Sequence, residues 1–175
     1  MKAKLFFLFA FICTIFSSCD LTGSSNYTPE ISLWASHIHR TDTIGLFLTD
    51  EGGVLRTDTI NVGDTIVLRM ALNGLSNNLT ELYITPSDTS ASKILLPVTA
   101  SLDTIFSKSG SNYSTRHFVF LPKQNFVYFP IRYIAAKPTL NAYIQLTLAS
   151  DAEFKSSSGN NSVSIKIKIP AGIAK

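Results

Sequence analysis

Hydrophobic and polar residues alternate with a period of two in three segments of the chain, which is the pattern of a β-strand with one buried side. In TIVLRMAL (65–72) every even-numbered residue is large and hydrophobic. YIQLTL (143–148) repeats the pattern at even positions, and VSIKIKI (163–169) shows it at odd positions. Because each segment presents one apolar and one more polar side, we expect antiparallel sheets that are buried on one face.

Seven further segments are weaker strand candidates, and turn-forming residues such as DEGG (50–53) and PKQN (122–125) separate them. No window between residues 30 and 170 has helical spacing. Many short strands at intervals of roughly 8–12 residues predict a sandwich or a barrel. We expect an all-β domain over residues 30–170, a single antiparallel β-sandwich of the immunoglobulin-like type, with a closed β-barrel as the alternative and a C-terminal tail over residues 171–175. The weaker candidates are Ile31–Ser36, Ile44–Thr49, Val54–Asn61, Thr80–Thr85, Ile94–Val98, Arg116–Leu121 and Phe126–Tyr133.

One candidate strand, within NFVYFPIRY (125–133), is apolar on both sides. This composition fits either a central strand or a contact surface. Pro130 has no N–H group to donate to a neighbouring strand, so it requires a sheet edge or a bulge nearby.

The first 18 residues are predicted to be a secretory signal peptide. MKAK (1–4) carries two lysines. LFFLFAFICTIF (5–16) is a largely apolar run of twelve residues, shorter than the roughly 18 that a membrane-spanning helix needs. Two serines then precede Cys19 directly. An N-terminal membrane anchor that is not cleaved is the alternative interpretation.

The residues FSSC (16–19) resemble a bacterial lipobox, in which small residues precede a cysteine that receives the lipid and becomes the first residue of the mature protein. Phe16 in place of the frequent leucine is similar to the relaxed lipoboxes of Bacteroidota lipoproteins. The other cysteine, Cys13, lies within the predicted signal peptide, so Cys19 has no disulfide partner in the mature chain. We therefore expect lipidation of Cys19 to anchor the protein to a membrane, with a flexible tether over residues 19–29.

Longer stretches resemble Bacteroidota cell-envelope lipoproteins with an immunoglobulin-like β-sandwich domain. The resemblance rests on DTINVGDTIVLRMALNGLSNNLTELYIT (58–85), FLPKQNFVYFPIRYIAA (120–136) and IQLTLASDAEF (144–154), together with the leader. It implies a fold and a compartment but no activity, because sandwiches carry many unrelated functions. We expect the cell envelope, with the outer membrane favoured over the inner one. DLTG (20–23) supplies a single acidic residue after the cysteine and leaves open whether the protein faces the periplasm or the exterior.

Charge and motifs exclude several classes of function. Without Lys2 and Lys4 of the signal peptide, 13 basic residues face 12 acidic ones, and they are not clustered, so we expect no nucleic-acid partner. The chain has no G-x-S-x-G nucleophile motif, no G-x-x-x-x-G-K-[ST] loop and no dinucleotide-binding fingerprint. We therefore expect a protein that is not an enzyme and has no cofactor.

HIHRTD (37–42) is the most metal-like stretch of the sequence. On a strand, His37 and His39 project from the same side, Asp42 is close, and His117 is the only other histidine. A catalytic zinc site requires three protein ligands and an open position, and nothing in the sequence determines the third ligand. We expect no bound metal, with the three histidines as weak candidates and a polar strand end or loop as the simpler interpretation.

The triplet Asp-Thr-Ile occurs four times, without the constant spacing of a tandem repeat. Asp favours turns and Thr-Ile favours strands, so the triplet is interpreted as the start of a strand. D-[ST]-aliphatic also resembles the acceptor signal for O-glycosylation of exported Bacteroidota proteins, and a glycan requires an exposed threonine. This resemblance implies the candidate O-glycosylation sites Thr43, Thr59, Thr65 and Thr104.

We expect a non-catalytic, lipid-anchored envelope protein whose sandwich presents a binding surface to a protein or a glycan. One alternative is a structural subunit of a surface assembly, fimbria-like or adhesin-like, in which residues 163–169 are donated to another sheet. Another is a carbohydrate-binding accessory lipoprotein, because large rings suit either sugar stacking or ordinary strand packing. The rings in question are Trp34, Tyr83, Tyr113, Tyr128 and Tyr143.

Overall fold

The structure is a computed structural model that describes residues 27–39, 42–46, 48–154 and 159–172. Within these ranges no helix has the length and apolar character of a membrane span. The elements are β1 (Glu30–His39), β2 (Asp42–Leu46), β3 (Thr49–Asp50), β4 (Leu55–Arg56), β5 (Ile60–Asn61), β6 (Thr65–Asn73), β7 (Leu79–Pro86), β8 (Ser92–Leu95), α2 (Thr99–Leu102), β9 (His117–Val119), β10 (Phe126–Ala135), β11 (Tyr143–Ser150), β12 (Ser162–Lys168) and β13 (Ala171–Gly172).

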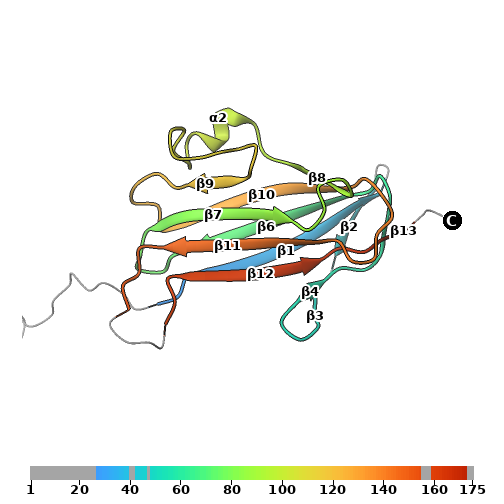
Figure 1. Cartoon of the computed structure of the whole chain (residues 1–175), viewed down its shortest axis with the longest axis horizontal. Coiled ribbons are helices and arrows are strands. Elements are labelled where there is room, and N and C mark those ends of the chain that lie inside the picture. Colours follow the sequence, from blue (N-terminus) through green and yellow to red (C-terminus); the bar gives the residue numbers. More distant parts are fainter. Residues whose placement is uncertain (1–26, 40–41, 47, 155–158, 173–175) are drawn as a thin grey trace, which may run out of the picture.

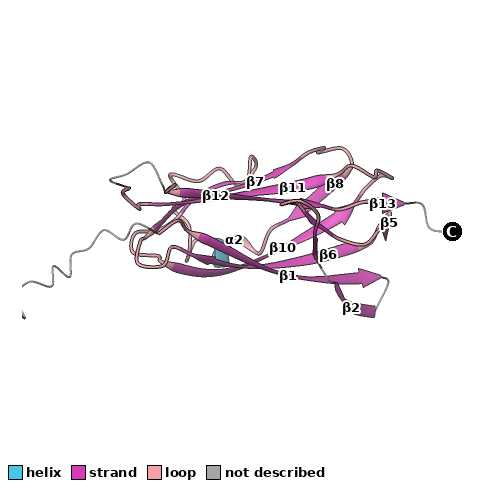
Figure 2. Cartoon of the chain, turned by 90° about the horizontal axis from the view of Figure 1, so that it is seen from below, coloured by secondary structure: helices cyan, strands magenta, loops and turns pink. Residues whose placement is uncertain are grey.

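Two sheets pack face to face (Figures 1 and 2). One has the strand order β2-β1-β6-β10-β8 and the other β3-β4-β12-β11-β7-β9, with antiparallel pairing between the long strands. The orders β1-β6-β10-β8 and β12-β11-β7 match the A-B-E-D and G-F-C orders of an immunoglobulin constant-type sandwich, with the strands in the same succession along the chain. The predicted all-β, immunoglobulin-like sandwich is thus confirmed, and the barrel alternative is wrong.

The inward sides of the strands form one hydrophobic core. All large hydrophobic residues at even positions of β6 and β11 are fully buried, and burying each such side chain stabilises the fold by about 1.5–3 kcal/mol. On β12, Ile167 is fully buried but Val163 and Ile165 are only half-buried. β4 pairs with only the last two residues of β12, so Val163 and Ile165 lie where β12 is the edge of the sheet. The three strictly alternating segments are therefore strands, as predicted.

Several phenylalanine rings of the core pack against one another, and the helix α2 lies beyond β9 at one edge of the sandwich (Figure 1). The ring of Phe106 lies 4.8, 4.9 and 5.3 Å, centre to centre, from the rings of Phe118, Phe120 and Phe129. The one-turn helix α2 departs from the expectation that no helix lies between residues 30 and 170. It buries only Leu102, and a single turn is too short to show a helical spacing of hydrophobic residues.

The weaker candidates all contain strands, but several bounds differ. Residues 54–61 hold two short strands rather than one, because β4 pairs with β12 whereas β5 pairs with β13. Ala171 and Gly172 belong to the domain and not to a tail from residue 171 on, since they form β13 and Ala171 is buried. Pro170 interrupts the alternation just before them, so the hydrophobic pattern did not reach them.

Candidate functional site

The outward side of the five-stranded sheet carries a group of exposed aromatic rings. Trp34 on β1 lies directly opposite Arg69 on β6, and Arg69 lies opposite Pro130 on β10. Tyr128 and Phe126 lie on the same side of β10, since side chains alternate along a strand. Trp34, Tyr128 and Phe126 are 54%, 50% and 56% exposed. Exposed aromatic side chains on one face of a sheet are candidates for a contact or ligand-binding site.

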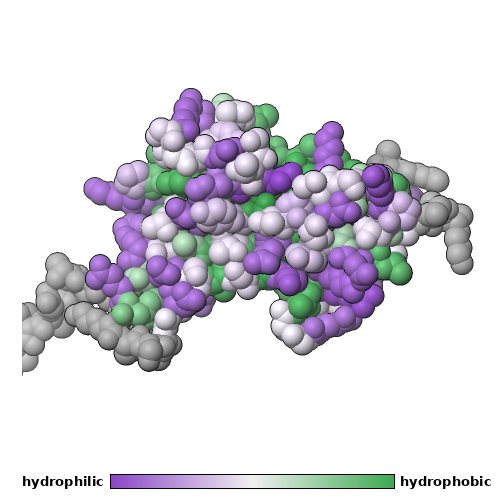
Figure 3. Space-filling model, in the orientation of Figure 1, coloured by the Kyte–Doolittle hydropathy of each residue, from purple (hydrophilic) through white to green (hydrophobic). Residues whose placement is uncertain are grey.

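The six-stranded sheet presents a different surface. Figure 3 shows this side of the molecule, where hydrophilic and intermediate residues predominate and hydrophobic ones form small areas. Lys166 Nζ lies 4.7 Å from the centre of the Tyr143 ring. Tyr83 stacks on His117 with ring centres 4.3 Å apart, and its hydroxyl donates a hydrogen bond to Glu81. The rings on this side are therefore already in contact with polar or charged neighbours.

The five rings nominated from the sequence thus do not form one surface. Trp34 and Tyr128 share the outward face of the five-stranded sheet, and two others lie on the opposite sheet. Tyr113 packs against Phe118 at the edge of the core, with ring centres 5.8 Å apart. Phe126 belongs to the first group but was not among the nominated rings, although its spacing of two residues from Tyr128 places it on the same side of β10.

A groove of about 570 Å³ opens on the ring-bearing face, beside the place where β8 ends. β8 pairs with β10 only at residues 132–135, so Pro130 lies at an open edge, as predicted. A second cavity of about 230 Å³ shares Pro97, Tyr128 and Pro130 with the groove. Ligand pockets typically measure roughly 300–1,000 Å³. The groove is therefore large enough to hold a small ligand or a segment of a larger one.

Two arginines, Arg69 and Arg132, give the otherwise mainly hydrophobic groove its charge. Arg69 Nη1 donates a hydrogen bond to Ser36 Oγ at 2.8 Å, which fixes the guanidinium against β1. Among the described residues, no carboxylate oxygen lies within 4 Å of either guanidinium. Because a guanidinium stays charged and offers five N–H donors, the groove presents donors for an anionic group.

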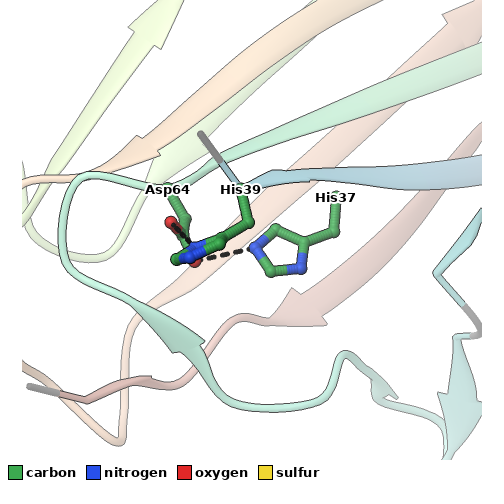
Figure 4. A group of neighbouring side chains, drawn as sticks. All are labelled: His37, His39 and Asp64. Atoms are coloured by element: carbon green, nitrogen blue, oxygen red, sulfur yellow. Dashed lines mark hydrogen bonds and ion pairs between the residues drawn. The ribbon is translucent and has the colours of Figure 1, made fainter. Parts of the chain in front are cut away.

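A second arrangement of functional side chains lies on the inward side of the same sheet, at one end (Figure 4). His37 and His39 project together from β1 towards Asp64, which lies just before β6. His37 Nε2 lies 2.8 Å from Asp64 Oδ2, and His39 Nδ1 lies 2.7 Å from Asp64 Oδ1. Each carboxylate oxygen therefore contacts one imidazole. These three residues are called the His–Asp–His cluster below.

A tight turn positions Asp64 in this cluster. Gly63 has a φ of 91°, a conformation that glycine adopts without strain, and the Asp64 N–H donates to the Asn61 carbonyl. The Asn61 N–H in turn donates to Asp64 Oδ2 at 3.0 Å. Burial acts to raise the pKa of Asp64, but the hydrogen bonds from His37, Asn61 and His39 outweigh it and hold that pKa below its ordinary value. Asp64 is thus an oriented, ionised acceptor.

The cluster brings together two of the three histidines nominated from the sequence. One ligand atom from each of His37, His39 and Asp64 lies within 4.8 Å of the other two, and two imidazoles with one carboxylate form a ligand set used by zinc and by non-haem iron. His117 lies apart, in contact with Tyr83 on the other sheet. Asp42 pairs with His39 across the β1–β2 hairpin but is exposed and outside the cluster.

The candidate O-glycosylation sites differ in exposure. Thr43, Thr59 and Thr104 are exposed, while Thr65 is half-buried on the outward side of β6. Ile60, the neighbour of Thr59, is buried at 1% exposure, whereas Thr59 itself is exposed. Three of the four threonines therefore have the accessibility that a glycan needs.

The interpretation of Asp-Thr-Ile as a strand start holds for three copies. β2 starts at Asp42, β5 at Ile60 and β6 at Thr65. It is wrong for residues 103–105, which directly follow α2. There the carboxylate of Asp103 contacts Lys108 Nζ at 2.8 Å and accepts a hydrogen bond from the Tyr113 hydroxyl, so this copy closes a turn instead.

The signal peptide (1–18), Cys19 and the tether as far as residue 26 lie outside the described residues, so lipidation stays a prediction. Neither the comparison with protein-family models nor the comparison with curated protein sequences gives a match. The function is therefore argued from the geometry of the groove and of the His–Asp–His cluster.

Proposed function

We propose that the protein is a non-catalytic, lipid-anchored binding protein of the cell envelope, and that the groove on its five-stranded sheet binds an acidic carbohydrate. One observation carries this proposal: exposed Trp34 and Tyr128 share a sheet face with two arginines that have no carboxylate partner among the described residues. The leader and the lipobox-like FSSC (16–19) support the anchor and the compartment.

Tyr128 lines the groove, and Trp34 adds flat apolar surface beside it on the same sheet face, directly opposite Arg69. Trp34 and Pro130 lie opposite the same residue of β6 from its two sides, which places them about 10 Å apart. Tyr128 lies one row further along the sheet, next to Pro130. Sugar rings have flat apolar faces that pack on such side chains, and aromatic rings lose little conformational entropy when they are covered.

The arginines favour acidic sugars over neutral ones. A guanidinium forms two parallel hydrogen bonds with a carboxylate, and such charge-assisted pairs are roughly twice as strong as neutral hydrogen bonds. The Ser36 hydroxyl already orients Arg69, so less entropy is lost when its remaining donors bind a ligand. Uronic acids combine the carboxylate and the apolar ring face that this groove accommodates.

Two other modes of recognition receive less support. A peptide added as a strand to the open edge of β10 needs backbone donors, and Pro130 has none to offer at this edge. In the assembly-subunit alternative, residues 163–169 are donated to another molecule, but residues 163–168 lie in β12, which pairs with β11 of its own chain. A carbohydrate held by side chains needs neither arrangement.

The position of the groove suits a protein held by its N-terminus. The predicted tether (19–29) leads directly into β1, which begins at Glu30. Glu30 and Phe126 both lie opposite Asn73, at this end of the sheet. Arg132 is six residues further along β10 than Phe126, or roughly 20 Å. The arginines of the groove thus lie away from the anchored end.

Isothermal titration of the full chain in detergent tests the ligand. We expect oligogalacturonates to bind and neutral maltooligosaccharides of the same length not to bind. Trp34→Ala and Arg132→Gln should each weaken binding roughly ten- to hundredfold, because the first removes a ring that the ligand covers and the second removes a charged hydrogen bond. Tyr83→Ala and Arg56→Gln on the other sheet are the matched controls and should bind normally. Equal binding of both sugars, or full binding by Trp34→Ala, contradicts the proposal.

Membrane fractionation tests the anchor separately. Cys19→Ala should leave the protein without acyl chains and move it from the membrane fraction to the soluble fraction. A Cys19→Ala variant that still sediments with membranes and still incorporates labelled palmitate argues against lipidation at this residue, whatever the groove binds.

A further inference from the structure

The His–Asp–His cluster has no part in the proposed groove, because it lies on the opposite side of β1. It sits where β2 reaches beyond the core: Ile44, which pairs with His37 on this side of the sheet, is 57% exposed. Side-chain exposure falls from 37% at His39 to 18% at His37 and 6% at Asp64. The cluster therefore has a buried floor and one side that is open to solvent.

The ligand atoms of the cluster already lie close to metal-site spacing. The two imidazole–carboxylate distances are 2.8 and 2.7 Å. Two ligands that each bind a tetrahedral ion at about 2.0 Å are about 3.3 Å apart. An ion can replace these hydrogen bonds once each imidazole–carboxylate pair separates by about 0.5 Å and the two imidazole ligand atoms, which lie within 4.8 Å of each other, come to a similar spacing.

Each ligand stands on a paired or hydrogen-bonded part of the backbone. β1 is flanked by β2 and β6, and it carries His37 and His39 two residues apart, on one side. The Asn61 N–H holds the carboxylate of Asp64 in its orientation, the role that outer-shell hydrogen bonds have in metal sites. Ligands on such elements are positioned before the ion arrives.

We propose that His37, His39 and Asp64 form a Zn²⁺ site with one coordination position open to water. Two imidazoles and a carboxylate suit Zn²⁺, whereas Ca²⁺ and Mg²⁺ take mainly oxygen ligands. The ion ties the β1–β2 hairpin to the turn that precedes β6, so its binding stabilises this end of the sandwich. This site shares no residue with the proposed groove, so the two proposals are tested independently.

Zn²⁺ titration tests the site. The full chain is purified in detergent without a polyhistidine tag, stripped with a chelator and dialysed. We expect the wild type to bind one Zn²⁺ per chain, with an unfolding temperature that rises with Zn²⁺ concentration and does not rise with Mg²⁺ or Ca²⁺. His37→Gln, His39→Gln and Asp64→Asn should each weaken binding by at least about tenfold. His117→Gln, the same change in the histidine outside the cluster, should bind like the wild type.

Two results overturn the proposal. One is the absence of saturable Zn²⁺ binding by the wild type. The other is binding that His39→Gln leaves unchanged, or that His117→Gln weakens as much as His39→Gln does, because the ion then binds elsewhere. Asp64 also accepts the Asn61 N–H, so Asp64→Asn is at risk of misfolding. His39→Gln, at the most exposed ligand, keeps the test decisive in that case.

Discussion

Ser36 and His37 are neighbours on β1 whose side chains serve opposite sides of the same sheet. Ser36 Oγ accepts a hydrogen bond from Arg69 in the groove, and His37 Nε2 contacts Asp64 on the inward side. Because β1 is hydrogen-bonded along both edges, its residues hold fixed positions relative to one another. The groove and the His–Asp–His cluster thus share one strand.

The protonation of Asp64 should make the metal-free protein sensitive to acid. The pKa of Asp64 is held below its ordinary value, so its interactions stabilise the fold above the unfolded pKa of about 3.9 and are lost as the pH falls through the folded pKa. Between about pH 5 and pH 3, the free energy of unfolding should therefore fall more for the wild type than for Asp64→Asn. Urea unfolding in the presence of a chelator measures this, with exposed Asp42→Asn as the control. Identical pH dependence in the wild type and Asp64→Asn argues against the prediction.

Tyr133→Phe should stabilise the protein. The side chain of Tyr133 is fully buried, and its hydroxyl has no hydrogen-bond partner among the described residues. Removing an unsatisfied buried group should raise the free energy of unfolding by about 1 kcal/mol. Tyr83→Phe, whose hydroxyl donates to Glu81, is the control and should not be stabilised.

The same residue predicts an alkaline effect. Burial, with a contribution from Asp88, raises the pKa of Tyr133 to about 12. A raised folded pKa means that stability is fully present below the unfolded value of about 10 and is lost as the pH rises through about 12. Tyr133→Phe should lose less stability over this range than the wild type. Equal losses in both proteins contradict the prediction.

Leu146→Ala should destabilise the sandwich far more than Leu140→Ala. Leu146 on β11 is fully buried, whereas Leu140 is 65% exposed. Truncation in the core loses transfer free energy and leaves a cavity, at a cost of about 2–5 kcal/mol. The exposed change should stay within about 0.5 kcal/mol. Urea midpoints of the two variants measure the difference, and similar midpoints argue against the core described here.

O-glycosylation should follow the exposure of the candidate threonines. We expect Thr43, Thr59 and Thr104 to carry glycans in protein taken from its native envelope, and half-buried Thr65 to carry less. Intact-mass spectrometry should show that Thr59→Val lowers the mass by one glycan and that Thr65→Val changes it least. A native mass that equals polypeptide plus lipid rules glycosylation out.

The long strands could be predicted from the sequence because burial of one side imposes an alternation of hydrophobic and polar residues. A side chain in β6 that faces the core must be apolar, and one that faces outward is free to vary, so alternation reports the strand directly. The short strands β4 and β5 have two residues each, too few for any period. They form by pairing with β12 and β13, which are distant in the sequence, and the local hydrophobic pattern does not predict such pairing.

Only part of the candidate site could be predicted from the sequence, because local patterns do not record contacts between distant segments. Spacing along one strand predicted that His37 and His39 share a side. Asp64 joins them from a turn 25 residues after His39, and that meeting depends on the register between β1 and β6. The sorting of Trp34 and Tyr128 onto one face, away from Tyr83, likewise depends on which strands share a sheet. Register and sheet membership are properties of the assembled fold.

The parallel pairs at the C-terminal end have a consequence for how the protein is made. Ile167 pairs with Leu55, and Ala171 pairs with Ile60, across more than a hundred residues of chain. These pairs, and the pairing of β12 with β11, form only once β12 and β13 are present. If the chain is exported as proposed, its sandwich therefore stays incomplete until β12 and β13 have crossed the membrane, and an incompletely folded chain can pass through a translocation channel.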